Sequence, residues 1–547
     1  MSRDLTSAVV VAENIRSFCR SWPESAFYFQ QLLNYINTNS NLRPGAAIPG
    51  IRAFQIYESS EEITITTTGT RLKQVEFPPS ASNPSIWNPS FVIVQGHLCP
   101  EAVVELSFRC DLRPEFFLGF LELERVRLKF RNSYELPALP SRRGNIVNIR
   151  MVSLWRFNSF RSQDHLPVNV EPMERNETDR ACQKYEKDLF ENHKAGATRF
   201  RKVHLHDSKH FTVEQLVALC VVPSGTDGNR WRTIFLLDGG NDLPGSFDYP
   251  WNSALRPPGL APSLLSAVRY NERISPFSIN RGDHKTIFDP PAPARENEFC
   301  MRPYDPLRIY AGMNGPELLS RPFFGLASVL SSAALSWNQV LNFIEEDIAK
   351  YQDVPAEETS SALVQVRFNA GVIQRFQGFI QLDLETVRDD SWNAISMLHS
   401  REARGNGENR DEVERSLDRE QEISHAELVR DYESLLARCK LLSSRCESAS
   451  SLLQSAVGLL ESQESIRQNR ELNKLTKLAF VFVPVSLVSS IFGMNVVEIN
   501  PGSIPSVWHF FLTAVLLLIL CLFLSLKNKW PTQKKFTLPR WVRRWVI

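Results

Sequence analysis

The chain has 547 residues, with 62 basic and 61 acidic side chains and a formal net charge of +1. Its apolar fraction of 43% and charged fraction of 22% are those of an ordinary folded protein. This composition excludes disordered, collagen-like and disulfide-scaffold chains, and the balanced charge argues against nucleic-acid binding. The nine cysteines form no CxxC pair, which favours reduced thiols over a disulfide framework.

Residues 1–310 are expected to form a mixed α/β domain. Residues 1–40 are predicted to be helical, because Ile15, Phe18 and Phe29 fall on a rough apolar stripe. Apolar and β-branched runs predict strands at residues 63–68, 103–108, 146–157 and 231–237. Polar turn clusters separate these runs, and a proline-rich segment at residues 285–306 suggests a loop or domain edge.

Two polar clusters in this region are candidate sites. His204, His206 and His210 have a metal-like spacing beside Asp207, but a cluster of this kind on an exposed polar loop is more often part of the surface. Residues 238–242 resemble a turn after a strand. The sequence contains no catalytic or nucleotide-binding motif in a fitting context, so no enzyme is predicted.

From residue 315 the sequence becomes helical, with a helical part at 315–400 and one stalk helix of about 100 Å at 409–477. Ten acidic and four basic residues between Glu408 and Glu433 give a net charge of −6, and seven basic and four acidic residues between Arg438 and Lys477 give +3. The acidic end is expected to be a solvated face, with a divalent-cation sensor as the alternative. A broken seven-residue repeat is typical of a helical bundle or coiled coil: Leu428, Leu435, Leu442, Leu453 and Leu460.

Two uncharged runs follow, at residues 478–497 and 507–526, and each is long enough to cross a membrane as a helix. The outer loop between them, residues 498–506, carries turn residues and predicts a tight hairpin. Buried helices of a soluble domain are the alternative. The tail at residues 527–547 has seven basic and no acidic residues, and the loop carries only Glu498, so the positive-inside rule predicts cytosolic termini.

The first run ends in Gly493-Met494-Asn495, at the outer end of an uncharged helix that a nine-residue loop joins to a second one. In this setting the sequence resembles the CorA-type family of magnesium and divalent-cation transporters, from about residue 410 to residue 547. The resemblance implies a long cytosolic helix that runs into the first of two membrane spans, and a pentamer. The same tripeptide at residues 312–314 lies in a Pro/Gly-rich stretch and is assigned no role.

The resemblance implies a selectivity filter at Gly493, Met494 and Asn495. Mg²⁺ gives up water reluctantly, so the neutral side-chain oxygen of Asn495 suits its hydration shell. Glu498 is expected to attract cations electrostatically. Steps of three and four back from Gly493 give a stripe typical of a pore-lining helix, with ordinary helix packing as the alternative: Ser490, Ser486, Val483, Ala479, Leu475 and Leu472.

The predicted function is passive movement of divalent cations, Mg²⁺ first, through a homo-oligomeric pore. Lipid and further copies of the chain are the expected partners, no resident cofactor is expected, and the plasma membrane is favoured over an internal membrane. Phe492 replaces the tyrosine that is usual in the family, which leaves zinc, cobalt or nickel open as the cargo. A second hypothesis is a membrane-anchored interaction or signalling protein that has lost transport.

Overall fold

The chain consists of two compact units, Met1–Leu453 and Gln454–Ile547. The strand predicted at residues 63–68 and the proline-rich segment at 285–306 lie outside the described residues. The computed structural model describes residues 4–21, 26–37, 51–56, 72–75, 91–123, 145–158, 172–224, 230–240, 260–265, 322–351, 354–355, 358–389, 408–493 and 507–527.

An eight-stranded sheet forms the middle layer of the first unit. The strand order is β2-β1-β3-β7-β6-β4-β8, with β5 paired to β6 off this path. β3 and β7 run parallel, and the other pairs among the described strands are antiparallel. The strands predicted at 146–157 and 231–237 are confirmed. The bounds are β1 (Ile51–Ile56), β2 (Leu72–Val75), β3 (Phe91–Gln95), β4 (Ile146–Asn158), β5 (Lys202–Leu205), β6 (His210–Ser224), β7 (Arg230–Leu237) and β8 (Leu260–Leu265).

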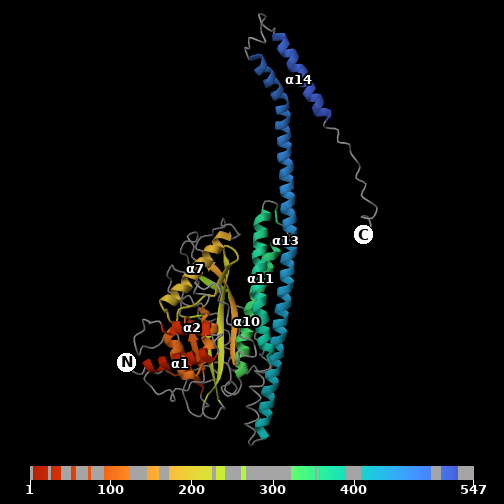
Figure 1. The fold of residues 1–547 in the computed structure, drawn as a ribbon. Helices are drawn as coiled ribbons and strands as arrows, with labels where there is room; N and C mark the ends of the chain where they lie inside the picture. Colours follow the sequence, from red (N-terminus) through yellow and green to blue (C-terminus); the bar gives the residue numbers. More distant parts are fainter. Residues whose placement is uncertain are drawn as a thin grey trace. The chain divides into compact units, whose positions relative to one another are not determined.

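Side chains alternate between the two faces of the sheet, and each face carries its own helices. In β3, Val92 and Val94 join one core cluster, whereas Phe91 and Ile93 join the other. The Val92 side is covered by four helices near the N-terminus, two of which Figure 1 labels, and a further helix packs on β5. These helices are α1 (Asp4–Ser21), α2 (Ala26–Ile36), α3 (Pro100–Cys110), α4 (Pro114–Leu121) and, on β5, α7 (Pro172–Glu191).

The strand predicted at residues 103–108 is wrong, because these residues lie inside helix α3. Pro100 stands at the start of this helix, where its missing N–H costs nothing. Ala102, Leu106 and Cys110 are buried at intervals of four, so the burial follows the helical period. The adjacent β-branched residues Val103 and Val104 favoured the prediction of a strand, but the tertiary contacts of one helical face stabilise a helix here.

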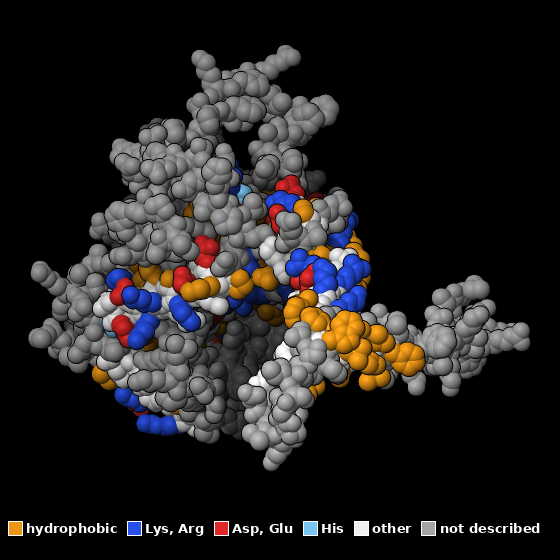
Figure 2. All heavy atoms as spheres, turned by 90° about the horizontal axis from the view of Figure 1, so that it is seen from above, with side chains coloured by type: hydrophobic (Ala, Val, Ile, Leu, Met, Phe, Trp, Pro, Cys, Tyr) orange, Lys and Arg blue, Asp and Glu red, His pale blue; other side chains and the backbone are white. Residues whose placement is uncertain are grey.

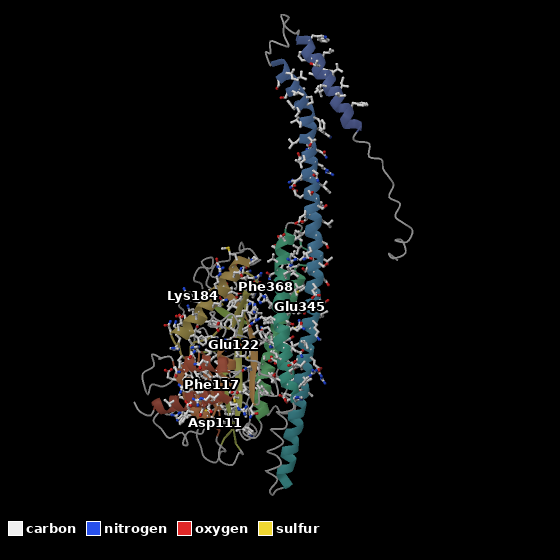
Figure 3. The ribbon with its side chains drawn as sticks, viewed as in Figure 1. Asp111, Phe117, Glu122, Lys184, Glu345 and Phe368 are labelled. Carbon is white, nitrogen blue, oxygen red and sulfur yellow. The ribbon has the colours of Figure 1, made fainter. Side chains whose placement is uncertain are left out.

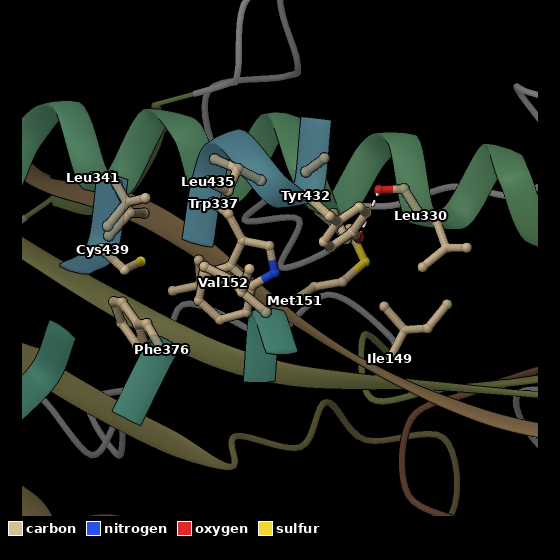
Figure 4. Packing of buried hydrophobic residues seen from close by; sticks show 14 of the residues in the cluster. Ile149, Met151, Val152, Leu330, Trp337, Leu341, Phe376, Tyr432, Leu435 and Cys439 are labelled. Atoms are coloured by element: carbon tan, nitrogen blue, oxygen red, sulfur yellow. Dashed lines mark hydrogen bonds between the residues drawn. The ribbon is translucent and has the colours of Figure 1, made fainter. Parts of the chain in front are cut away.

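On the other face of the sheet lie three long helices, α10 (Pro322–Ala349), α11 (Thr359–Arg388) and the first part of α13 (Glu408–Gly493). Figure 4 shows Trp337 of α10 beside Met151 and Val152 of β4, and the rings of Trp337 and Phe376 of α11 lie 5.0 Å apart in the same core. The α13 side chains that join this core recur at steps of four and three, apart from one gap: Leu428, Tyr432, Leu435, Cys439, Leu442, Cys446 and Leu453.

Polar contacts fix the position of α13 on α10 within this unit. The hydroxyl of Tyr432 donates to the carbonyl oxygen of Leu330 at 2.9 Å. Glu345 of α10, labelled in Figure 3, accepts from Arg438 at 2.5 Å and from Arg445 at 2.6 Å. These two arginines lie one heptad apart, so they repeat along one edge of α13 beside its apolar stripe.

A buried charge network joins the segment before β5 to the end of β7 and to helices α4 and α7. Arg201 makes a two-pronged contact with Asp238, at 2.6 and 2.8 Å, and neither side chain is exposed. Arg199 pairs with Glu186 of α7, and both arginines donate to the carbonyl of Phe120. Asp238 therefore does more than end a strand, because removing one member of such a pair leaves an uncompensated buried charge.

The stripe on α13 can be tested with two neighbouring leucines. Leu442 is fully buried, whereas Leu441 is 52% exposed on the other side of the helix. Leu442→Ala is expected to lower the free energy of unfolding by about 2–5 kcal/mol, because it leaves a cavity. Thermal or denaturant unfolding of the detergent-solubilised protein measures this. Leu441→Ala is the matched control, and equal losses in both variants would contradict the packing.

Candidate ion pathway

The second unit is built from the last part of α13 and from α14 (Val507–Lys527). Helix α13 continues without a break to Gly493 and contains Pro484 in its interior. A proline there forgoes one backbone hydrogen bond, a defect that membrane helices tolerate more often than soluble ones. No charged residue occurs between Lys477 and Gly493.

Apolar side chains in this unit are mostly exposed. Helix α13 includes, within Ser424–Ile491, an apolar window long enough to cross a membrane, and only 12% of that window is buried. A shorter apolar helical stretch, Phe511–Leu520, lies in α14. Figure 2 shows hydrophobic side chains gathered in a band on this unit. A soluble monomer rarely exposes so much apolar surface, so lipid or further protein is needed to cover it.

The two helices each bury one small patch. Val488 of α13 and Ala514 of α14 are buried, whereas their apolar neighbours Leu487 and Val515 are exposed. Pro484, four residues before Val488 on α13, is also buried. Burial of so few residues, on one side of α13, is what a helical hairpin gives when the two helices face each other along one line. The rest of the α13 surface is left free by this contact.

The predicted pore-lining stripe lies on the free surface of α13. Gly493 is the last helical residue, and a Cβ added to it would meet no atom within 4 Å. Met494, Asn495 and Glu498 lie outside the described residues, so the predicted filter is described only at its first position. All six predicted lining residues are exposed in the single chain: Ser490, Ser486, Val483, Ala479, Leu475 and Leu472.

A model of a known protein family matches the same part of the chain. Residues 404–528 match the model described as CorA-like Mg2+ transporter protein. They form a CorA-like segment. The resemblance proposed from the sequence is thereby confirmed for that segment. The matched range includes the whole of α13, the tripeptide Gly493-Met494-Asn495 and the whole of α14. No curated protein matches the chain.

Outside the CorA-like segment, the histidine cluster differs from its prediction. The expected exposed polar loop is wrong, because His204, His206 and Asp207 are buried where β5 turns into β6. Strand pairing places these residues under α10 and α11, which periodicity in the sequence could not show. The alternation of Val203, Leu205 and Phe211 with the histidines could have indicated strands in place of a loop, but such a pattern places the histidines on the polar face and gives no sign of their burial.

Each side chain of this cluster has at least one local partner, although His206 Nδ1 is buried without one. His204 Nε2 lies 2.7 Å from Glu214 Oε1, and Arg375 donates to both oxygens of Glu214 at 2.6 and 2.8 Å. Although burial raises the pKa of Glu214, hydrogen bonds from Arg375 and His204 hold it well below its usual value. His206 Nε2 lies 3.1 Å from the hydroxyl of Thr212. In the described part of the chain, no group of His, Cys, Asp or Glu side chains is arranged to hold a metal ion.

His206 makes the stability of the first unit sensitive to acid. Burial, with smaller contributions from His204 and other neighbours, lowers the pKa of His206 from 6.5 to about 3. The unfolded chain therefore takes up a proton below pH 6.5 that the folded chain refuses, so stability is fully present above pH 6.5 and falls toward pH 3. The expected slope is about 1.4 kcal/mol per pH unit for this group.

Unfolding midpoints between pH 7 and pH 4 measure this slope. His206→Gln keeps a polar side chain without the titration, so its midpoint should fall less steeply with acid than that of the unchanged protein. His97 is a second case, because burial lowers its pKa to about 3 as well. His97→Gln with His206→Gln should flatten the curve further. Parallel curves for all three proteins would contradict the assignment.

Proposed function

We propose that this protein moves divalent cations, Mg²⁺ first, passively across a membrane through a pore formed by several copies of the chain. The observation that carries the proposal is the family match over residues 404–528, which includes the uncharged part of α13 and its end at Gly493. The chain acts as a transporter in this account, and not as an enzyme. Mg²⁺ is the cargo, and no resident cofactor is needed.

The mouth of the pore is formed by Gly493, Met494 and Asn495. Mg²⁺ binds its water tightly and dehydrates slowly, so a site that accepts hydrogen bonds from this water can select the ion without stripping it. The amide oxygen of Asn495 is such an acceptor. One chain supplies one amide, so a ring requires an oligomer, and the family resemblance favours a pentamer. Glu498, repeated around the mouth, would raise the local cation concentration.

The conducting path runs from the mouth along the exposed stripe of α13. Ser490 and Ser486 offer hydroxyl groups near the mouth, and Val483, Leu475 and Leu472 can close the path by dewetting. The exposure of these apolar side chains in the single chain supports this role, because an isolated monomer gains nothing from exposing them. A divalent ion that enters down a potential of 100 mV gains about 4.6 kcal/mol, which is enough to drive uptake without a nucleotide.

The topology follows from the distribution of charge. The uncharged run at residues 507–526 serves as the second span, and both termini face the cytosol because the tail at 527–547 carries seven basic residues. The plasma membrane is the favoured location, with an internal membrane as the alternative. Transport of zinc or another divalent ion by the same architecture is the nearest alternative cargo.

A second candidate function is supported by the extent of the match. The family model begins only at residue 404, and the large sheet-containing unit lies mostly before it. A chain of this kind could keep its hairpin as an anchor and use the sheet-containing unit to bind partners. Ion flux decides between the two functions.

The filter is tested by Asn495→Ala in cells that depend on added Mg²⁺. Uptake should fall to the level of cells without the protein, because the amide ring that holds the hydrated ion is lost. The sequence provides a matched control in Asn314→Ala, since Gly312-Met313-Asn314 repeats the tripeptide in a different setting. Asn314→Ala should leave uptake unchanged.

Uptake of Mg²⁺, with Zn²⁺, Co²⁺ and Ni²⁺ as competitors, is measured at matched membrane expression. If the unchanged protein takes up no more of any of these ions than Asn495→Ala does, transport is excluded and the anchored interaction protein is favoured.

A further inference from the structure

A carboxyl group lies inside the apolar core that joins α10, α11 and α13. Asp383 of α11 is 2% exposed, and Ile380, Leu384 and Val387 beside it on the helix are buried apolar residues. The Oδ2 atom of Asp383 is buried without a hydrogen-bond partner in the described part of the chain. An unpaired carboxylate inside a protein is costly, so packing alone would favour an apolar residue at this position.

Two buried donors that act on Asp383 also lack a partner. They are Nε1 of Trp337 on α10 and Nη1 of Arg150 on β4. The Arg150 guanidinium lies 5.4 Å from the centre of the Phe379 ring, one turn before Asp383, but its ion pair is with Glu122. Unpaired buried polar atoms are rare in native proteins. Here one acceptor and two donors meet without a bond among them, so a second arrangement of the same groups is available.

Burial decides the protonation of Asp383. It raises the pKa of this carboxyl group well above its usual value, against smaller lowering effects of Trp337 and Arg150. Asp383 is therefore held as a neutral acid. Among the described residues, the titratable or charged groups that face it from other elements are Arg150 of β4 and Tyr432 of α13, and α10 presents the non-titratable Trp337.

The same turn of α11 holds α13 in place. The charge of Asp383 acts on Tyr432, whose hydroxyl donates to the carbonyl oxygen of Leu330 at 2.9 Å. One turn after Asp383, the carbonyl oxygen of Val387 lies 2.7 Å from Nε2 of His425 on α13. Figure 4 shows Trp337 and Tyr432 in this core. A negative charge at Asp383 would therefore stand against the contacts that join α13 to α10 and α11.

We propose that Asp383 is a pH-sensitive switch beneath α13. The neutral acid lets α10, α11 and α13 pack together, and the ionised carboxylate turns to Nη1 of Arg150 and loosens α13 from the other two helices. The carboxyl proton goes to solvent, and no covalent bond other than O–H changes. Alkaline conditions favour the loosened state. The switch goes beyond transport, and only its effect on ion flux rests on the proposed pore, because α13 continues to Gly493.

The side chain of Cys439 reports on the loosening of α13. This thiol is fully buried in the stripe of α13 that packs on α10 and α11, seven residues after Tyr432. Cys220 of β6 is the matched control within the same chain, because it is buried on the opposite face of the sheet. Burial raises the pKa of both thiols to about 12. Both should therefore react with an alkylating reagent only when the surrounding structure opens.

Asp383→Asn keeps the size of the neutral acid and removes its titration. The full chain in detergent is alkylated between pH 6 and pH 9, and labelled peptides are identified by mass. Labelling of Cys439 in the unchanged protein, divided by that in Asp383→Asn at the same pH, should rise about tenfold per pH unit until Asp383 ionises in the packed state. The packed state holds a proton that the loosened state releases, so packing is strongest at low pH and is lost as pH rises.

The controls separate a local switch from general unfolding. The corresponding ratio for Cys220 should stay constant, because the sheet remains folded. Glu385→Gln, at an exposed position of α11, should follow the unchanged protein at both thiols. Arg150→Gln with Glu122→Gln removes the partner of the ionised carboxylate without leaving a lone charge, so Cys439 labelling at alkaline pH should fall towards that of Asp383→Asn.

The infrared difference between the unchanged protein and Asp383→Asn at pH 7 should contain the carbonyl band of a protonated carboxylic acid. Absence of this band, a Cys439 ratio that does not change with pH, or an equal change at Cys220 would each overturn the switch. Unaltered labelling in the Arg150–Glu122 double variant would overturn the role of Arg150. Ion flux is measured on the same proteins, and a pH-dependent Cys439 ratio without any flux refutes the pore only.

Discussion

Helix α13 carries two apolar stripes on different faces. Other parts of the same chain bury only the first stripe, and the second needs a partner from outside the chain. Between Leu428 and Leu453 the stripe faces α10 and α11 and is buried. After residue 459, the positions that continue the buried stripe in steps of seven carry the charged residues Arg467, Arg470 and Lys474. The positions without charge lie about a third of a turn away around the helix. A helix that changes its apolar face along its length is built for two different surroundings.

Between Leu428 and Leu453, helix α13 packs on a rigid core formed by the same chain. The sheet buries apolar side chains on both faces, and the α10–α11 layer is fixed to β4 by Trp337 and Phe376. Buried pairs such as Arg201 with Asp238 tie the connecting loops to the same core. Glu345 then holds Arg438 and Arg445 at the edge of α13. The second surroundings, lipid and further copies of the chain, are supplied from outside in the proposed account.

The sequence predicted the parts of the molecule whose pattern is local. Strands at 146–157 and 231–237 followed from apolar runs, and the heptad leucines indicated the α13 stripe, although Tyr432, Cys439 and Cys446 complete it. The prediction was wrong where tertiary contacts decide. Residues 103–108 fold as a helix because one face packs on the sheet, and His204, His206 and Asp207 are buried by helices that begin more than 110 residues later in the chain. Asn495 and Glu498 lie outside the described residues, so their roles stay predictions.

A passive divalent-cation pore formed by this chain alone needs only the purified protein and a lipid bilayer. The protein is placed in liposomes that contain a Mg²⁺ indicator, and a potential is imposed with a potassium gradient. Mg²⁺ entry is expected to follow the imposed potential and to need no nucleotide. Entry no faster than in protein-free liposomes, in samples where the protein is inserted and oligomeric, would contradict it.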